Sequence, residues 1–154
     1  LGSEFELIKP KFFHGTIYAT NNEVQSIQNW RDKMPLVYLY EILTETRNRN
    51  KIEQTEVSAN CRIFFLDSLQ HGQLHTDTIY NSVIEYQDDI LECFLDYLYN
   101  NGQVKEIQTY EVTPLTHFGR ITENGIENLF LTENLSGLEL SINLEFKKIL
   151  NCNC

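Results

Sequence analysis

The stretch EVSANCRIFF, which runs from Glu56 to Phe65, alternates apolar and polar side chains along most of its length. Because successive side chains of a strand point to opposite faces, this alternation predicts a strand with one buried and one wet face. A second alternating stretch lies near the end of the chain, from Leu138 to Lys147. Two strands of this kind predict a sheet with a core on one side.

Further strands are expected on either side of these two. The segment from Leu36 to Leu43 is nearly all apolar and β-favouring, which is typical of a strand covered on both faces. It leads into the basic run Arg47 to Lys51, which we expect to form the turn of a long hairpin. The segment from Val104 to Phe118 predicts more β structure, broken at Pro114 because proline cannot donate to a ladder.

The segment from Asp77 to Tyr99 has the clearest helical pattern. It predicts a long amphipathic helix that lies on the sheet, with no Lys or Arg among its residues. A shorter helix is expected after Thr20 and Glu23, which form a capping box. The apolar side of the long helix is predicted to hold Ile79, Val83, Tyr86, Ile90, Phe94, Tyr97 and Leu98, and the opposite side Glu85, Asp88, Asp89, Glu92 and Asp96.

The expected order of elements is therefore arm, strand, strand, helix, strand, strand. This order predicts an α+β fold, in which a mainly antiparallel sheet (β-hairpin, then helix, then further strands) packs against one long amphipathic helix. Residues 1–5, LGSEF, read like a protease and cloning-site remnant. Residues 6–154 are expected to form a single α+β domain with an N-terminal arm.

Composition narrows the class of protein. The chain has 154 residues, of which 42% are hydrophobic, enough for one real core. No apolar run approaches the roughly 18 residues that a membrane-spanning helix needs. The 22 Asp and Glu outnumber the 12 Lys and Arg, for a formal net charge of −10. Such an acid excess argues against nucleic-acid binding over a broad surface, because phosphate contacts need clustered cations.

Metal-site candidates are weak. His71 and His75 have roughly the spacing of metal ligands, with Asp77 nearby, but a loop pair without a third or fourth fixed ligand is not specific. Cys152 and Cys154 are too short a signal for zinc without a second ligand pair. Surface histidines are the simpler interpretation, and we assign no metal and no cofactor.

Catalytic candidates are equally few. Cys61 or Cys93 would need His117 as a partner, yet both cysteines fall on faces predicted to be buried and inert. The helix carboxylates line one outward stripe, whereas acid–base pairs face a cleft in opposed environments. The chain has no Gly-rich phosphate loop and no nucleophile elbow. We therefore expect no enzyme and no catalytic residues.

The charge layout favours a contact between proteins. Like charges on the helix repel one another without interleaved lysines, while three cations crowd the expected hairpin tip. We hypothesise that the tip of one subunit meets the acidic helix of the next, a contact of two different patches that closes into a ring. Ordinary solvated surfaces are the alternative. The candidate subunit interface consists of Arg47, Arg49, Lys51, Glu85, Asp88, Asp89, Glu92 and Asp96.

A series of landmarks also runs through the chain in order. The landmarks are Phe12-Phe13-His14-Gly15, Pro35-Leu36-Val37-Tyr38-Leu39, Phe64-Phe65-Leu66-Asp67, the helix, Leu135-Ser136-Gly137-Leu138-Glu139-Leu140 and Cys152. Their order and spacing resemble small virion proteins from tailed phages of Bacteroidota hosts, a group similar to tail-terminator or head–tail connector (neck) proteins. The resemblance spans roughly Glu6 to Cys154, and it departs from the family at Leu138, where an aromatic residue is usual.

This resemblance implies a tail-terminator-like fold and a virion structural protein that is made in the host cytoplasm. Such a subunit forms a homo-oligomer, commonly a hexameric ring, and joins other virion proteins such as the tail tube or connector. It implies no membrane and no sequence-specific nucleic acid, although DNA passes through the lumen. A different interpretation of the same residues is an acidic binding module, of the inhibitor or immunity type, that docks on a basic partner.

Overall fold

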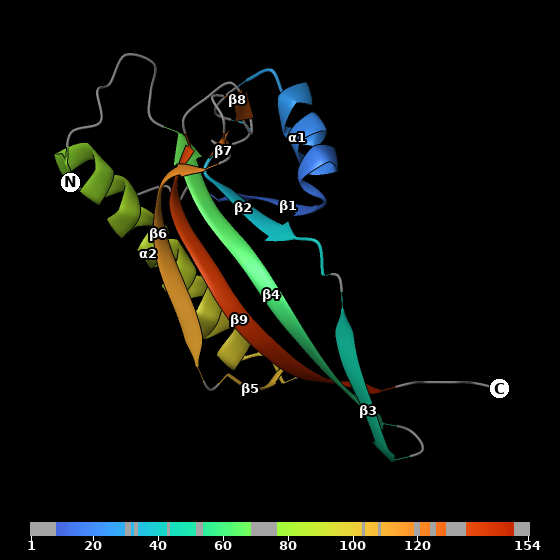
Figure 1. The fold of residues 1–154 in the computed structure, drawn as a ribbon. Coiled ribbons are helices and arrows are strands. Elements are labelled where there is room, and N and C mark those ends of the chain that lie inside the picture. Colours follow the sequence, from blue (N-terminus) through green and yellow to red (C-terminus); the bar gives the residue numbers. More distant parts are fainter. Residues whose placement is uncertain are drawn as a thin grey trace.

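Two fifteen-residue strands, β4 (Gln54–Ser68) and β9 (Leu135–Ile149), pair antiparallel along their whole length and form the middle of the molecule (Figure 1). The structure is a computed structural model that describes residues 9–29, 32, 34–42, 44–51, 54–68, 77–102, 104–107, 109–118, 121–123, 126–128 and 135–149. The two strands are those whose alternation is clearest in the sequence.

Within the described ranges, seven strands form one sheet around this central pair. One end of β4 pairs with β2, and its other end pairs with β3. β1 runs parallel to β2, whereas β5 and β6 both lie antiparallel to β9. The remaining bounds are β1 (Lys11–Gly15), β2 (Leu36–Tyr40), β3 (Glu45–Lys51), β5 (Val104–Glu106) and β6 (Tyr110–Phe118), with a separate two-stranded sheet of β7 (Ile121–Glu123) and β8 (Ile126–Asn128).

The predicted fold class is wrong. The protein is mostly sheet, a curled mixed sheet in which β1 and β2 are parallel and the other pairs are antiparallel, rather than a sheet whose partner layer is one long amphipathic helix. Part of the reason lies in the segment Lys11–Gly15, which was expected as an arm or a short strand and pairs along its length with Leu36–Tyr40. A parallel pair needs a crossover between its strands, and the residues between β1 and β2 supply it.

The sheet has cores on both of its faces, and the sequence of β4 records where each begins. Val57, Ala59 and Cys61 point into the first core, while the residues between them are half-buried or exposed. From Ile63 the alternation gives way to the apolar run to Leu66, because Phe64 and Leu66 enter a second core on the other face. A strand covered on both faces needs such a run.

The helix α2 (Asp77–Tyr99) contributes to the first core through a face that overlaps the predicted one only in part, at Ile90, Phe94 and Leu98. Leu91, Leu95 and Leu98 are buried with residues of β4 and β9, whereas Tyr86 and Tyr97 are 36% and 68% exposed. The apolar stripe of α2 is wide, and only one side of it meets the sheet.

The helix α1 (Ile17–Ser26) covers the second core and begins earlier than its predicted start. Thr16 is its N-cap, since the Thr16 hydroxyl accepts a hydrogen bond from the Ala19 N–H at 3.2 Å. Thr20, which was expected to be the cap, lies inside the helix and is buried. Gly15, at φ 125°, turns the chain from β1 into α1, a conformation that suits glycine.

The basic run also differs from its prediction. Residues 47–51 were expected to form a turn, but they belong to β3, where Arg47 lies opposite Val57 and Asn48 lies opposite Glu56. Polar residues form a strand here because the edge of β4 offers backbone hydrogen bonds to them. The apolar strand expected from Leu36 ends at Tyr40, so β2 and β3 are separate strands.

We expect Gly137→Ala to destabilise the fold severely. A Cβ added at Gly137 would lie 1.8 Å from the Phe65 carbonyl oxygen and 3.0 Å from the Leu66 Cα, both backbone atoms of β4. Separating the central strands should lower the free energy of unfolding by about 3 kcal/mol. Urea denaturation measures this loss. Gly102→Ala is the matched control, because a Cβ there meets nothing within 4 Å, and an equal effect of both substitutions would contradict the prediction.

Candidate surfaces for subunit contacts

The strand β3 gathers the basic residues that the sequence singled out. Arg47, Arg49 and Lys51 all belong to it by their backbone, and a register shift between Asn48 and Lys51 interrupts the strand's regular alternation. Arg47 donates to the Glu45 carboxylate at 2.8 Å, but both side chains are largely solvated. An exposed pair of this kind contributes at most about 1 kcal/mol, so the Arg47 guanidinium can exchange partners at little cost.

The structure adds two cations that sequence reasoning missed. In the β4–β9 ladder, Lys147 lies opposite Glu56 and Lys148 opposite Thr55, so β9 ends beside β3 and β4. The only signal in the sequence was the alternation of both long strands, which does not reveal their register. We call this end of the three strands the basic end. By backbone position it contains five of the chain's 12 Lys and Arg, of which the side chains of Arg47 and Arg49 are described; the five are Arg47, Arg49, Lys51, Lys147 and Lys148.

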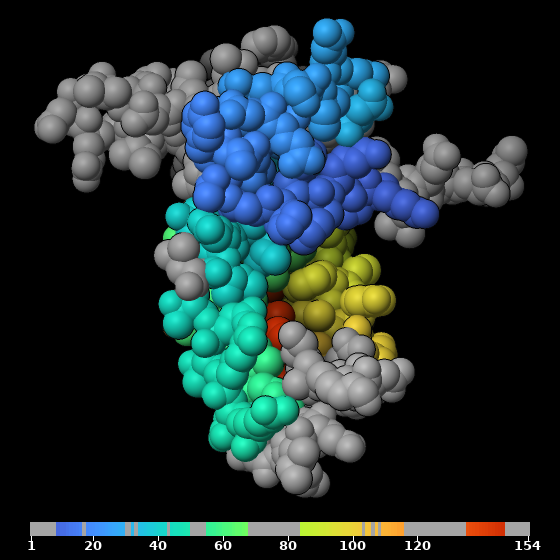
Figure 2. Space-filling model, turned by 90° about the vertical axis from the view of Figure 1, so that its right-hand side faces the viewer, coloured from blue at the N-terminus to red at the C-terminus, as the bar shows by residue number. Residues whose placement is uncertain are grey.

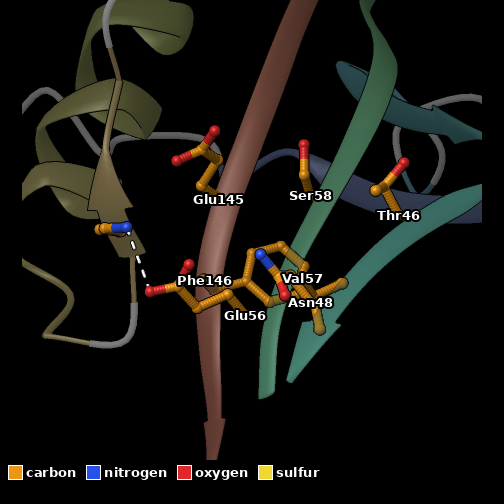
Figure 3. A pocket seen from close by; sticks show the side chains of 8 residues that line it. Thr46, Asn48, Glu56, Val57, Ser58, Glu145 and Phe146 are labelled. Atoms are coloured by element: carbon orange, nitrogen blue, oxygen red, sulfur yellow. Dashed lines mark hydrogen bonds and ion pairs between the residues drawn. The ribbon is translucent and has the colours of Figure 1, made fainter. Parts of the chain in front are cut away.

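A shallow polar hollow of about 160 Å³ lies on the same three strands. Figure 3 shows Thr46, Ser58 and Glu145 side by side across β3, β4 and β9, as their register requires. The Lys105 ammonium reaches the Glu56 carboxylate at 3.2 Å and closes one side. The hollow is small, and two carboxylates, Glu56 and Glu145, line it against one ammonium, Lys105.

The five carboxylates predicted on one side of the helix do lie together on α2. All of them are exposed, and none belongs to an ion pair among the residues that the structure describes. Carboxylates three and four residues apart on a helix repel each other by a few tenths of a kcal/mol per pair. We call this surface the acidic face; it consists of Glu85, Asp88, Asp89, Glu92 and Asp96.

The basic end and the acidic face therefore exist as two separate patches. Among the described residues, no ion pair joins Arg47 to an α2 carboxylate. The predicted residues are thus gathered into two groups by the fold, and the fold does not bring the two groups together. Lys51 belongs to β3 by its backbone, and its side chain lies outside the described part of the structure.

A second cationic feature was missed by sequence reasoning. The Arg62 guanidinium lies over the rings of Tyr40 and Phe64, at 5.6 and 5.5 Å from their centroids. Its Nε donates to the Glu139 carboxylate at 2.7 Å, and this hydrogen bond raises the pKa of Arg62. The alternation of β4 placed Arg62 on the wet face, but only the register against β2 and β9 reveals its partners.

The two cysteines in the described part have opposite environments. Cys61 is buried as predicted, and burial raises the pKa of its thiol, which disfavours the reactive thiolate. The prediction of a buried Cys93 is wrong, because Cys93 is exposed on the side of α2 that the sheet does not cover. The His117 side chain lies outside the described residues, so the expectation that neither cysteine forms a Cys–His pair is not tested.

The other sequence candidates for metal binding fall where the structure makes no description. His71, His75, Cys152 and Cys154 all lie outside the described residues. Among the residues that are described, no three His, Cys, Asp or Glu side chains are grouped so that they could hold a metal ion. Within the same ranges, no helix has the length and apolar character needed to cross a membrane.

Comparison with known proteins adds no relative. No protein-family model matches the chain, and no curated protein matches its sequence. The function must therefore be argued from the surfaces described above.

The contrast between the two cysteines predicts different reactivity. In the folded protein, iodoacetamide should modify Cys93 at least about tenfold faster than Cys61, because the Cys61 thiol is buried and protonated. Peptide mass mapping after timed quenching resolves the individual cysteines. In urea the two rates should converge, and similar rates in the native protein would contradict the assigned burial.

We expect Arg62→Ala to lower the free energy of unfolding by about 1 kcal/mol, because it removes both the ring contacts and the bond to Glu139. Arg62→Lys should lose much of the same amount, since an ammonium cannot stack on the rings. Lys105→Ala, which breaks the exposed pair with Glu56 without touching a ring, is the control. Chemical denaturation measures all three, and equal losses for Arg62→Ala and Lys105→Ala would argue against the ring contacts.

Proposed function

We propose that this protein is a structural subunit of a tailed-phage virion, a tail terminator or head–tail connector (neck) protein, which assembles into a ring through contacts between copies. The observation that carries the proposal is the separation of charge. Exposed carboxylates occupy one helix, and five cations lie at the end of the sheet. The sequence resemblance to small virion proteins supplies the biological setting.

Two different complementary patches on one chain favour a head-to-tail contact. When the basic end of one copy meets the acidic face of the next, each copy keeps one patch for a further neighbour. Such heterologous contacts form a closed ring if the rotation between copies closes, and a filament if it does not. A tail terminator or connector requires the closed form, commonly with six copies.

Charge also suits the proposed setting. The chain keeps a net charge of −10, so the ring as a whole repels the phosphates of passing DNA rather than trapping them. Pairing the basic end with the acidic face uses cations and carboxylates in the interface. It therefore leaves the negative excess on the remaining surface.

Reversing the charge of the basic end tests the contact. Arg47→Glu together with Arg49→Glu should abolish rings at protein concentrations where the unchanged chain forms them. Reversing two of the acids as well, by Asp88→Lys and Glu92→Lys, should restore rings, because opposite charges face each other again. Mass photometry and negative-stain electron microscopy measure the number and shape of the assemblies.

Two controls make this test specific. Lys11→Glu makes the same change in charge as Arg47→Glu, but on β1 and outside both patches, so it should leave assembly unaffected. Raising the salt concentration should weaken assembly, because exposed charges are screened over about 10 Å at 0.1 M. Rings that persist in the double reversal would overturn the proposed contact. If the chain does not assemble with itself but its acidic face binds a basic protein, the binding-module interpretation would be favoured instead.

The place in the virion is tested separately from the contact. Genes for a portal, a major capsid protein and a tail-tube protein should flank the gene for this chain. Antibodies against the chain should label the neck of the virion in electron micrographs. Absence of such neighbours and of such labelling would reject the virion assignment even if rings form.

A further inference from the structure

An apolar groove of about 530 Å³ runs between α2 and β1. Val37 and Phe65 of the sheet line it, together with Phe12 of β1 and the α2 residues Tyr86, Cys93 and Tyr97. Figure 2 looks onto this side of the molecule, where a hollow lies below β1 and beside α2. The only charged residues that line the groove in the described structure are Lys9 and Asp89.

The groove exists because the sheet is wider than the helix. Leu91, Leu95 and Leu98 hold α2 over β4 and β9, while Phe12 at the edge of the sheet stays exposed beyond the helix. The rings at its lip are strongly exposed, Phe12 by 61% and Tyr97 by 68%. Exposed aromatic side chains gathered around an apolar groove are typical of an interaction site.

The charge beside the groove indicates what it binds. Asp89 belongs both to the groove lining and to the acidic face, so the groove opens beside five carboxylates. Lys9 balances Asp89 within the lining itself, so the attraction for a positively charged occupant comes from the acidic face beside the groove. Arginine suits this setting, because its aliphatic stem packs on apolar surface while its guanidinium stacks on rings and pairs with carboxylates.

The molecule already contains one such arrangement. Arg62 lies over Tyr40 and Phe64 and is fixed by Glu139. The groove offers the same kinds of group, aromatic rings beside a carboxylate, without an arginine.

We propose that this groove receives the basic end of a second copy, with Arg47 or Arg49 of β3 placed over its aromatic lip and paired with Asp89. This inference rests on the proposed ring assembly and names the site that anchors it. Breaking the ion pair between Arg47 and Glu45 costs little free energy, because both residues are on the same exposed strand, so Arg47 is available to pair with Asp89 of another copy. The opposite charges of the basic end and the acidic face align the two copies.

Cys93 reports directly on whether the groove is filled. Its thiol is exposed in the single chain and lies in the groove lining. Assembly should slow its modification by iodoacetamide by at least about tenfold, and Arg47→Glu with Arg49→Glu should restore the fast rate. Cys61, which is buried in the core, is the internal reference in the same digests.

Substitutions at the lip test the energetic contribution. Phe12→Ser and Tyr97→Ser should each raise the dissociation constant of the assembly by about tenfold, because they remove rings that the arginine contacts. Both side chains are mostly exposed, so the single chain should keep its stability in urea. Tyr18→Ser is the matched control, since Tyr18 is 78% exposed on α1 and does not line the groove.

A covalent test identifies the occupant. With Cys152 and Cys154 replaced by serine, Glu45→Cys places a thiol on the same face of β3 as Arg47. Mild oxidation should then link this thiol to Cys93 of another copy, and mass spectrometry of the digest identifies the joined peptides. Asn60→Cys, exposed on β4 and away from the basic end, should give no such link.

The outcomes separate this inference from the proposed function. One outcome would overturn the groove as the contact site but support the ring. In that outcome the rings depend on Arg47 and Arg49, yet Cys93 is still modified rapidly in them and Phe12→Ser and Tyr97→Ser do not weaken assembly. A chain that stays monomeric at every concentration would overturn the ring proposal and the groove with it. Native mass spectrometry that finds a small apolar molecule bound to the single chain, together with slow iodoacetamide modification of Cys93 in that single chain, would overturn the assigned occupant.

Discussion

The pairing of β4 with β9 is the constraint on which the rest of the structure depends. The fifteen-residue ladder reaches from Gln54 and Ile149 at one end to Ser68 and Leu135 at the other. Every other strand of the main sheet except β1 attaches to one of these two. The apolar residues of the pair enter both cores, the first beside α2 and the second on the opposite face. The free edge of β4 allows a polar strand, β3, to form, because β4 supplies its hydrogen bonds.

The same pairing explains why charges that are scattered in sequence gather in space. Arg47 and Lys147 are separated by almost the whole sheet-forming part of the chain, but both lie within one register step of Glu56 or Val57. On α2 the helical periodicity likewise brings carboxylates from different turns to one side of the helix. A chain with a formal charge of −10 thus acquires one end enriched in cations. Like charges within each patch repel one another, so contact with an oppositely charged surface would reduce this repulsion in either patch.

Local patterns predicted the central strands well, because alternation at Val57, Ala59 and Cys61 reports directly on a single buried face. They failed where tertiary pairing decides the outcome. The local sequence pattern does not distinguish an arm from the parallel strand β1. The basic run Arg47–Lys51 has the composition of a turn, and only its pairing with β4 makes it a strand. These two errors contribute to the wrong fold class. The acidic face was predictable from periodicity alone, whereas Lys147, Arg62 and the groove all required the register of the sheet.

The apolar stripe of α2 shows how a failed sequence prediction can carry functional information. The stripe is wider than the core needs, and the sheet buries Leu91 and Leu95 while Tyr86 and Tyr97 stay exposed. A helix selected only for its own fold would place polar residues on that second side, because exposed rings there add no stability to the single chain. The apolar side chains of α2 that the sheet does not bury lie instead beside Asp89, where aromatic and acidic groups are close together. The part of the helix that the core leaves unused is thus the part that the proposed assembly would bury.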